Sequence, residues 1–280
     1  MKSTKFNLAS ILATMLVFIS LTAHAQFFGV TGSGNVVKQE RNVGDFSTIK
    51  ILGSADVIVT QGDRTVVQVQ ADDNLLENII TKVKGDALIV ETEGSIRNYK
   101  KFEVLVTLSR LDGIEINGSG DLESEGVIKG NSLSISINGS GDVELELNYN
   151  HLEAQVNGSG DIEISGITGD LELDVMGSGD FSASELRLNT CNLSIFGSGD
   201  VKLNGSASSV SVDVSASGDV NLYNLSAQDV EVSNNGSGDV IVSVSGKLKA
   251  RLMGSGDLTY RGTPTGVDVS SLGSGSVYKK

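Results

Sequence analysis

Aspartates that recur at a near-constant spacing are the residues of this sequence best placed to do chemistry. They stand at eight positions, 18 to 21 residues apart, namely Asp121, Asp142, Asp161, Asp180, Asp200, Asp219, Asp239 and Asp257. Seven of them end a Gly-Ser-Gly-Asp sequence, one ends Ala-Ser-Gly-Asp, and Gly-Ser-Gly-Ser at 273–276 closes the series. If the chain turns once per repeat, these carboxylates form a column, and oxygen ligands in register are what Ca²⁺ prefers.

Two features argue against a calcium site in this repeat. Calcium-binding β-rolls have nonapeptide repeats with Gly-Gly-x-Gly-x-Asp turns, so the period here is about twice too long. Each turn also offers one carboxylate, whereas Ca²⁺ takes about six to eight oxygen ligands. We therefore predict a structural turn with no metal and no cofactor. Calcium binding stays as the alternative, which a calcium titration of the melting temperature would test.

Glycine and aspartate have separate roles in the predicted turn. Glycine reaches positive φ without steric cost, so paired glycines let the chain turn sharply on both sides of the serine. Serine and aspartate side chains accept hydrogen bonds from backbone N–H groups of their own turn. We expect Gly160→Val to destabilise by more than about 1 kcal/mol because the turn needs positive φ, and Asp161→Asn to be mild. The predicted structural turn residues are Gly118, Gly120, Asp121, Gly139, Gly141, Asp142, Gly158, Gly160, Asp161, Gly177, Gly179, Asp180, Gly197, Gly199, Asp200, Gly218, Asp219, Gly236, Gly238, Asp239, Gly254, Gly256 and Asp257.

Apolar and polar residues alternate between the turns, which predicts strands with one buried face. The inward sets expected in three of the repeats are Val143, Leu145, Leu147, Leu152, Ala154 and Val156, then Val201, Leu203, Val210, Val212 and Val214, then Val240, Val242, Val244, Leu248, Ala250 and Leu252. The near-identity of the turns favours stacking of each coil on the last over an antiparallel meander or a barrel. We predict an all-β fold, in which residues 117–280 form a β-solenoid of two-strand coils of about 19–20 residues.

Residues 43–116 depart from the strict repeat and predict an irregular β portion that caps the stack. Strands are expected at 48–51, 56–60, 66–70, 87–91, 102–108 and 113–116. One short helical turn is expected after residue 72, with Asp73 or Asn74 as its N-cap. Gly53-Ser54-Ala55-Asp56 is a degenerate copy of the repeat turn, so this portion is predicted to begin the same stack.

The first 25 residues have the pattern of a signal peptide. Lys2 and Lys5 precede the apolar run of residues 8–21, and Ala23-His24-Ala25 predicts cleavage between Ala25 and Gln26. Residues 26–42 are then a leader segment. No cysteine follows the apolar run and no later segment is a candidate membrane span, so we expect an exported protein without a lipid anchor, located in the periplasm, at the cell surface or outside the cell.

Residues able to support catalysis are few. Nucleophilic catalysis needs a base beside the nucleophile, and the chain after residue 25 has one histidine, His151, and one cysteine, Cys191. We expect His151 in a surface loop and Cys191 partly buried, with no disulfide and no zinc site. Polysaccharide-active enzymes also use β-helices, but their catalytic carboxylate pair is unique, whereas these acids repeat. No enzymatic activity and no catalytic residue are predicted.

The charge balance limits the partners. Removal of residues 1–25 leaves 19 basic and 35 acidic residues, a net charge of −16. Nucleic acid is therefore excluded as a partner, because it needs a basic face to neutralise its phosphates. The polar strand faces favour a polysaccharide or a cell-surface protein. A scaffold whose copies stack end to end is the alternative, so a homo-oligomer stays open.

The segment Phe46-Ser-Thr-Ile-Lys-Ile-Leu-Gly-Ser-Ala-Asp-Val-Ile-Val-Thr-Gln-Gly-Asp63 resembles the opening of the putative autotransporter adhesin, head GIN domain family of Bacteroidetes. Asn74-Leu-Leu-Glu-Asn-Ile79, Leu88-Ile-Val90 and the repeated Asn-Gly-Ser-Gly-Asp fit the same pattern. The resemblance covers about residues 46 to 275. It implies a secreted β-solenoid with a surface or adhesive role, and it brings no catalytic or ligand-binding residues.

Overall fold

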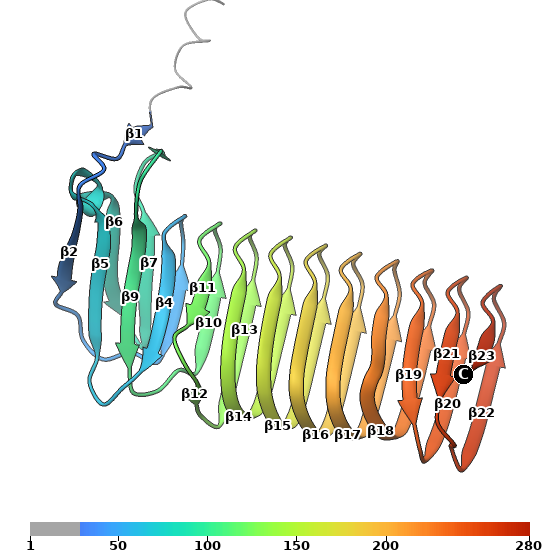
Figure 1. Ribbon diagram of the computed structural model, residues 1–280. Helices are drawn as coiled ribbons and strands as arrows, with labels where there is room; N and C mark the ends of the chain where they lie inside the picture. The colour runs from blue at the N-terminus through green and yellow to red at the C-terminus, as the bar shows by residue number, and fades with distance from the viewer. Residues whose placement is uncertain (1–28) are drawn as a thin grey trace, which may run out of the picture.

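Each Gly-Ser-Gly-Asp repeat forms one coil of a parallel β-solenoid in a computed structural model, which describes residues 29–280 (Figure 1). The predicted signal peptide and its cleavage point between Ala25 and Gln26 lie outside the described residues. Every pairing between successive coils is parallel, as in the register of Leu152 with Leu171 and of Leu171 with Cys191. The stacked solenoid is therefore confirmed over the meander.

The middle coils are each a single bent strand of 14 or 15 residues. These strands are β14 (Val143–Val156), β15 (Ile162–Val175), β16 (Phe181–Ile195), β17 (Val201–Val214) and β18 (Val220–Asn234). The coils at either side are divided into β10 (Gly113–Ile116), β11 (Leu122–Ser124), β12 (Ile128–Lys129) and β13 (Ser132–Ile137), and into β19 (Val240–Val244), β20 (Lys247–Leu252), β21 (Leu258–Arg261), β22 (Gly266–Ser271) and β23 (Val277–Lys279). The two predicted strands of a middle coil are thus joined through the bend.

Every coil has two corners and two outer faces. We call the Gly-Ser-Gly-Asp turn the tight corner and the opposite bend the wide corner. In Figure 1 the tight corners form the upper row of loops and the wide corners the lower row of bends. The first face is carried by the limb after the tight corner, such as residues 143–148, and the second face by the limb before the next one, such as residues 151–156.

A thin apolar core runs the length of the stack between the two limbs. All three inward sets expected from the alternation are buried, with exposed fractions of 4% or less. The core takes mostly Val, Ile, Leu and Ala, as the short distance between the limbs requires. Tyr149 is an exception at a wide corner, where its fully buried hydroxyl donates to the carbonyl of Leu111 at 2.6 Å.

The N-terminal end of the stack is covered. The strands there are β1 (Val30–Thr31), β2 (Val36–Arg41), β3 (Thr48–Ile51), β4 (Asp56–Gln61), β5 (Val66–Asp72), β6 (Ile79–Lys84), β7 (Ala87–Thr92), β8 (Ile96–Arg97) and β9 (Phe102–Leu108), with the 3₁₀ helix η1 at Asp73–Asn78. All six expected strands are present. β3 and β4 stack under β10 and β11, while β7 and β9 lie on their other side in parallel pairing. β5 and β6 then close the end through antiparallel pairs with β9 and β7.

The N-cap prediction for the short helix is wrong by one or two residues. The cap position belongs to Asp72, and its carboxylate makes no capping hydrogen bond. Instead, the fully buried Asp72 accepts the backbone N–H groups of Gly34, Lys100 and Lys101. Three N–H donors from two loops satisfy the carboxylate better than one donor of the helix, so this aspartate ties the leader segment to the cap.

The C-terminal end of the stack is open. β22 and β23 pair with β20 and β21 on one side, and in the part of the chain that is described no strand covers their other side. Leu272 is 71% exposed and Val267 49% exposed at this end. The solenoid therefore has one closed end and one end with an exposed edge and exposed apolar side chains.

Candidate functional site

The aspartates of the tight corners form a continuous hydrogen-bonded ladder. The backbone N–H of Asp161 donates to Oδ1 of Asp142 at 2.8 Å, and the N–H of Asp180 donates to Oδ1 of Asp161 at 2.8 Å. The same bond recurs from Asp56 to Ser276, at 2.7–3.1 Å. The first member, Asp56, belongs to the degenerate turn, whose predicted place in the same stack is confirmed. Burial raises the pKa of its carboxyl.

The prediction that each carboxylate serves its own turn is wrong. The N–H that each carboxylate accepts belongs to the equivalent residue of the next coil. The backbone at the serine also bonds between coils, since the N–H of Ser159 donates to the carbonyl of Gly139 one coil below at 2.9 Å. The corner residues thus join neighbouring coils where the strand ladder is interrupted.

The prediction that the corner glycines need positive φ is also wrong. None of the Gly-Ser-Gly-Asp glycines is among the residues with positive φ. Their need for glycine is steric, because a Cβ on Gly160 would overlap the carbonyl oxygen of Gly141 and reach the side chain of Ile137. At the second glycine of the corner the coils approach so closely that a side chain would collide with the coil below.

Positive φ is found instead at or near the wide corners. It occurs at Gly166 (85°), Gly169 (133°), Gly205 (143°) and Gly262 (103°), and Glu185 adopts it without being a glycine (57°). The register between coils shifts at or next to four of them, namely Gly166, Gly169, Glu185 and Gly205. The wide corners therefore have the positive φ angles that the glycine pattern predicts for the tight corners.

The carboxylates of the Asp column are engaged in this ladder. One oxygen of each carboxylate already accepts a backbone N–H. Among residues 29–280 no group of three or more His, Cys, Asp or Glu side chains is arranged to hold a metal ion. The column is a structural feature in this geometry, and its chemistry is that of hydrogen-bond acceptors.

His151 and Cys191 are 40 residues apart in sequence and lie in different coils. His151 is not in a loop, because β14 continues through the wide corner and its N–H donates to the carbonyl of Asn131. Cys191 is fully buried, deeper than expected, and burial raises its pKa to about 12. Its thiol therefore stays protonated at neutral pH and is a poor nucleophile.

Columns of polar side chains cover the outer faces. On the first face Glu123, Glu144 and Glu163 stand in register beside the Asp ladder. Towards the C-terminus the same column has no further carboxylate and continues with Ser182, Lys202, Asn221, Ile241, Thr259 and Tyr278. The first face is therefore acidic in its N-terminal half only.

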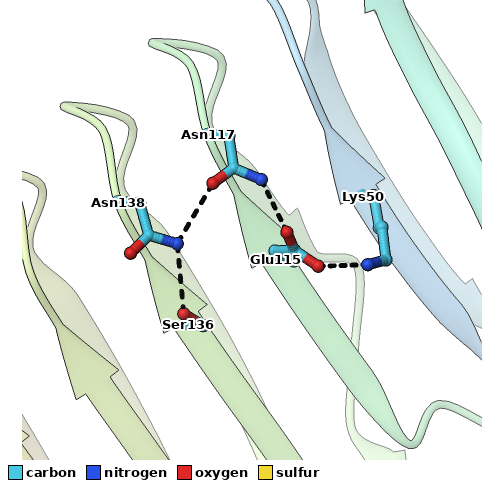
Figure 2. Close-up of polar contacts among 5 residues, drawn as sticks. All are labelled: Lys50, Glu115, Asn117, Ser136 and Asn138. Carbon is cyan, nitrogen blue, oxygen red and sulfur yellow. Dashed lines mark hydrogen bonds and ion pairs between the residues drawn. The ribbon is translucent and has the colours of Figure 1, made fainter.

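The second face begins with a chain of polar contacts across the three neighbouring strands β3, β10 and β13 (Figure 2). Lys50 pairs with Glu115, and Asn117 donates to Glu115 at 2.7 Å. Asn138 donates to Asn117 at 3.1 Å and to Ser136 at 3.3 Å. The hydrogen bonds from Lys50 and Asn117 lower the pKa of Glu115. These side chains are engaged with each other, so this part of the second face offers few free groups to a partner.

One cluster of side chains is not predicted by the sequence. Tyr223, Ser243 and Arg261 meet beside the wide corner of the later coils, with the Arg261 guanidinium carbon 4.1 Å from the centre of the Tyr223 ring. Nothing in the residue types singles out these three positions. A signal was nevertheless present, because the repeat spacing falls from 20 to 18 residues after Asp239. Where a shorter coil stacks on a longer one, some residues at the wide corner have no partner in the next coil.

In the described part of the chain, no helix has the length and apolar character needed to span a membrane.

Comparisons with known proteins agree with this architecture. Solved structures of putative adhesins from Parabacteroides merdae and Parabacteroides distasonis are similar to it, at 22% and 24% identity, with TM-scores of 0.67 and 0.66. Each match covers 90% of this chain, and 99% or 100% of the other. A putative lipid binding protein from Parabacteroides distasonis matches at 24% identity with a TM-score of 0.65, covering 90% of this chain and all of its own. These likenesses establish the fold.

No curated protein matches this chain. The family model described as "Putative auto-transporter adhesin, head GIN domain" matches residues 45–204 and 192–264, which is most of the solenoid together with its cap. The chain therefore belongs to the putative auto-transporter adhesin, head GIN domain family.

Proposed function

We propose that this protein is an exported, non-enzymatic binding module that acts as an adhesin. The observation that carries the proposal is the acidic half of the first face, where Glu123, Glu144 and Glu163 stand in register along the Asp ladder. Columns of identical acceptors at fixed spacing match a partner that is itself repetitive. A polysaccharide is such a partner, because its hydroxyl groups donate to carboxylates at regular intervals.

The rigidity of the face supports this proposal. The carboxylates sit on strands paired on both sides, and the Asp ladder fixes the corner beside them. A partner therefore does not have to order the surface that it binds, which lowers the entropic cost of each weak contact. Many such contacts along several coils add up by multivalency.

The absence of catalysis is part of the proposal and rests on repetition. A glycosidase needs two carboxylates in different environments, whereas the outstanding acids here occupy equivalent positions in successive coils. The buried Cys191 thiol and the distant His151 form no nucleophile–base pair. The predicted signal peptide and the adhesin family support export.

Two double variants in the same two coils test the face directly. Glu144→Gln/Glu163→Gln removes two in-register charges from the first face, and Glu153→Gln/Glu172→Gln removes two from the second. Both variants change the net charge equally, so they differ only in location. We would screen the chain from residue 26 on a glycan array and a panel of cell-surface proteins, and then measure both variants against each hit.

We expect the first-face variant to bind at least 10-fold more weakly and the second-face variant to bind like the wild type. Equal binding by all three proteins would contradict the first face as the binding surface. A hit on surface proteins alone would replace the polysaccharide with a protein partner. No hit in either screen would overturn the adhesin proposal.

The open C-terminal end favours a second candidate function, a scaffold of copies that pair through β22 and β23. Leu272 and Val267 are exposed there, and the strand edge is unpaired. Light scattering after size exclusion tests this function over a range of concentrations. A single monomeric species would exclude it, whereas dimers or filaments that are lost in Val267→Lys would support it.

A further inference from the structure

A short coil follows a long one near the C-terminal end, and the wide corner is uneven there. The spacing is 20 residues from Asp219 to Asp239 and 18 from Asp239 to Asp257. The register pairs Leu222 with Val242 and next Ser226 with Ser243, so residues 223–225 of β18 have no partner in β19. The shorter coil cuts across the corner and leaves a hollow of about 340 Å³, which we call the notch. Its volume is at the lower end of the usual range for ligand pockets.

The lining of the notch differs in charge from the rest of this acidic protein. It contains the cation Arg261 and no carboxylate. Polar groups come from Ser226, Gln228, Ser243 and Ser245, and Val244 adds apolar surface. The notch is therefore suited to an anionic ligand with hydroxyl groups.

The guanidinium of Arg261 is held in place before any ligand arrives. Its Nε donates to Oγ of Ser243 at 2.8 Å, and Ser243 donates in turn to the carbonyl of Tyr223 at 2.6 Å. The ring of Tyr223 lies against the guanidinium, and Ser243 is only 6% exposed. Among the described residues nothing accepts a hydrogen bond from the two terminal nitrogens of Arg261. A fixed guanidinium with a free edge is the usual partner of a carboxylate.

Backbone groups at the notch favour a sugar over a peptide. The carbonyls of Ala227 and Gln228 already accept the N–H groups of Ser245 and Gly246, at 3.0 and 2.7 Å. A bound peptide would need free backbone acceptors for its own N–H groups, whereas sugar hydroxyls can use the Ser226 hydroxyl and the Gln228 amide, and can donate to the Ser245 hydroxyl, whose own proton goes to the carbonyl of Ala227. We propose that the notch binds the carboxylate of a sugar acid residue in a polysaccharide, with Arg261 as the specificity-determining residue. This proposal rests on the adhesin function and names a chemical feature of its partner.

The experiment uses the chain from residue 26 and D-glucuronate as the probe. Ligand-observed NMR or calorimetry measures its Kd, which we expect on the order of 1 mM for a single sugar. D-glucose is the neutral counterpart and should bind at least 10-fold more weakly. A peptide with a free C-terminal carboxylate, compared with its amidated form, tests the competing ligand class.

Arg261→Gln is expected to weaken glucuronate binding at least 10-fold, and Arg261→Lys should weaken it several-fold because lysine lacks the planar fork. Arg251→Gln is the matched control, since it removes the same charge from the second face of the preceding coil and should bind like the wild type. Circular dichroism confirms that each variant is folded.

Equal glucuronate binding by the wild type and Arg261→Gln would overturn the proposal, as would selective binding of the free peptide carboxylate. The notch and the adhesin function can fail separately. If arrayed polysaccharides bind but Arg261→Gln leaves every hit unchanged, the notch is wrong and the adhesin stands. If glucuronate binding depends on Arg261 but no polysaccharide binds, the notch stands and the adhesin proposal fails.

Discussion

The two corners of each coil follow opposite rules. At the tight corner the sequence is nearly the same in every coil, the backbone has ordinary φ angles, and neighbouring coils touch through glycine. At the wide corner the sequence and length vary, the register shifts, and residues with positive φ occur. One corner therefore sets the spacing of the stack, and the other absorbs differences in coil length. Variation that creates a binding notch is tolerated at the wide corner because the tight corner keeps the coils aligned.

The largest effect is expected from adding a side chain at the tight corner. Gly160→Val places atoms where the carbonyl of Gly141 lies, so the two coils must separate. We expect a loss of about 3 kcal/mol, or roughly 6–12 °C in melting temperature. Thermal unfolding of the chain from residue 26 measures it. Ser159→Val, on the exposed residue of the same corner, is the control and should change stability by less than about 0.5 kcal/mol.

Substitutions to asparagine distinguish steric crowding from a need for positive φ as the reason for glycine at the tight corner. Asn tolerates positive φ, so Gly126→Asn, in the bend between β11 and β12 with φ 84° and open space around it, should cost less than about 0.5 kcal/mol. Gly160→Asn should lower the stability as much as Gly160→Val. A mild Gly160→Asn would restore the positive-φ explanation of the tight corner.

The second effect is at a wide corner, where Tyr149 is buried. Tyr149→Phe removes the donor to the carbonyl of Leu111 and should cost about 1–2 kcal/mol, because a buried acceptor loses its partner. Burial raises the pKa of Tyr149 to about 12, so the hydroxyl keeps its proton and donates throughout the physiological range. Tyr278→Phe, at a 53% exposed tyrosine, is the matched control and should be neutral in the same melt. Equal effects would mean that the hydroxyl of Tyr149 does not support its corner.

The third expected effect is a gain in stability. Glu185 holds a φ of 57° at a wide corner where other coils place glycine. Glu185→Gly relieves this strain and should stabilise by about 0.5–1 kcal/mol, after the entropic cost of glycine. Glu163→Gly, in a regular strand, should destabilise by about 1 kcal/mol. If both variants destabilise equally in urea unfolding, φ at the wide corner carries no strain.

Sequence periodicity predicted the stacked coils, the inward residues and the six strands of residues 43–116, because burial of one strand face imposes the alternation directly. It could not predict β2 and β6, whose partners are set by how the cap folds over the end of the stack. The steric reason for glycine at the tight corner could not be predicted either, since the sequence of one repeat does not give the distance between coils. The notch arises from a difference of two residues between neighbouring coils, so it becomes visible only once the register is known.

The smallest effect is expected at the Asp ladder of the tight corner. Asp161→Asn keeps an oxygen for the N–H of Asp180 and removes one charge from a column in which neighbours repel by about 0.9 kcal/mol before screening. We expect a change within about 0.5 kcal/mol, whereas Asp161→Ala leaves that N–H without its acceptor and should cost about 1 kcal/mol. Melting of both variants with and without calcium measures this difference. Because the acceptor matters and the charge does not, calcium should change neither result. A loss in Asp161→Asn that occurs only in calcium would show instead that the column binds the ion, and the tight corner would then be a site as well as a spacer.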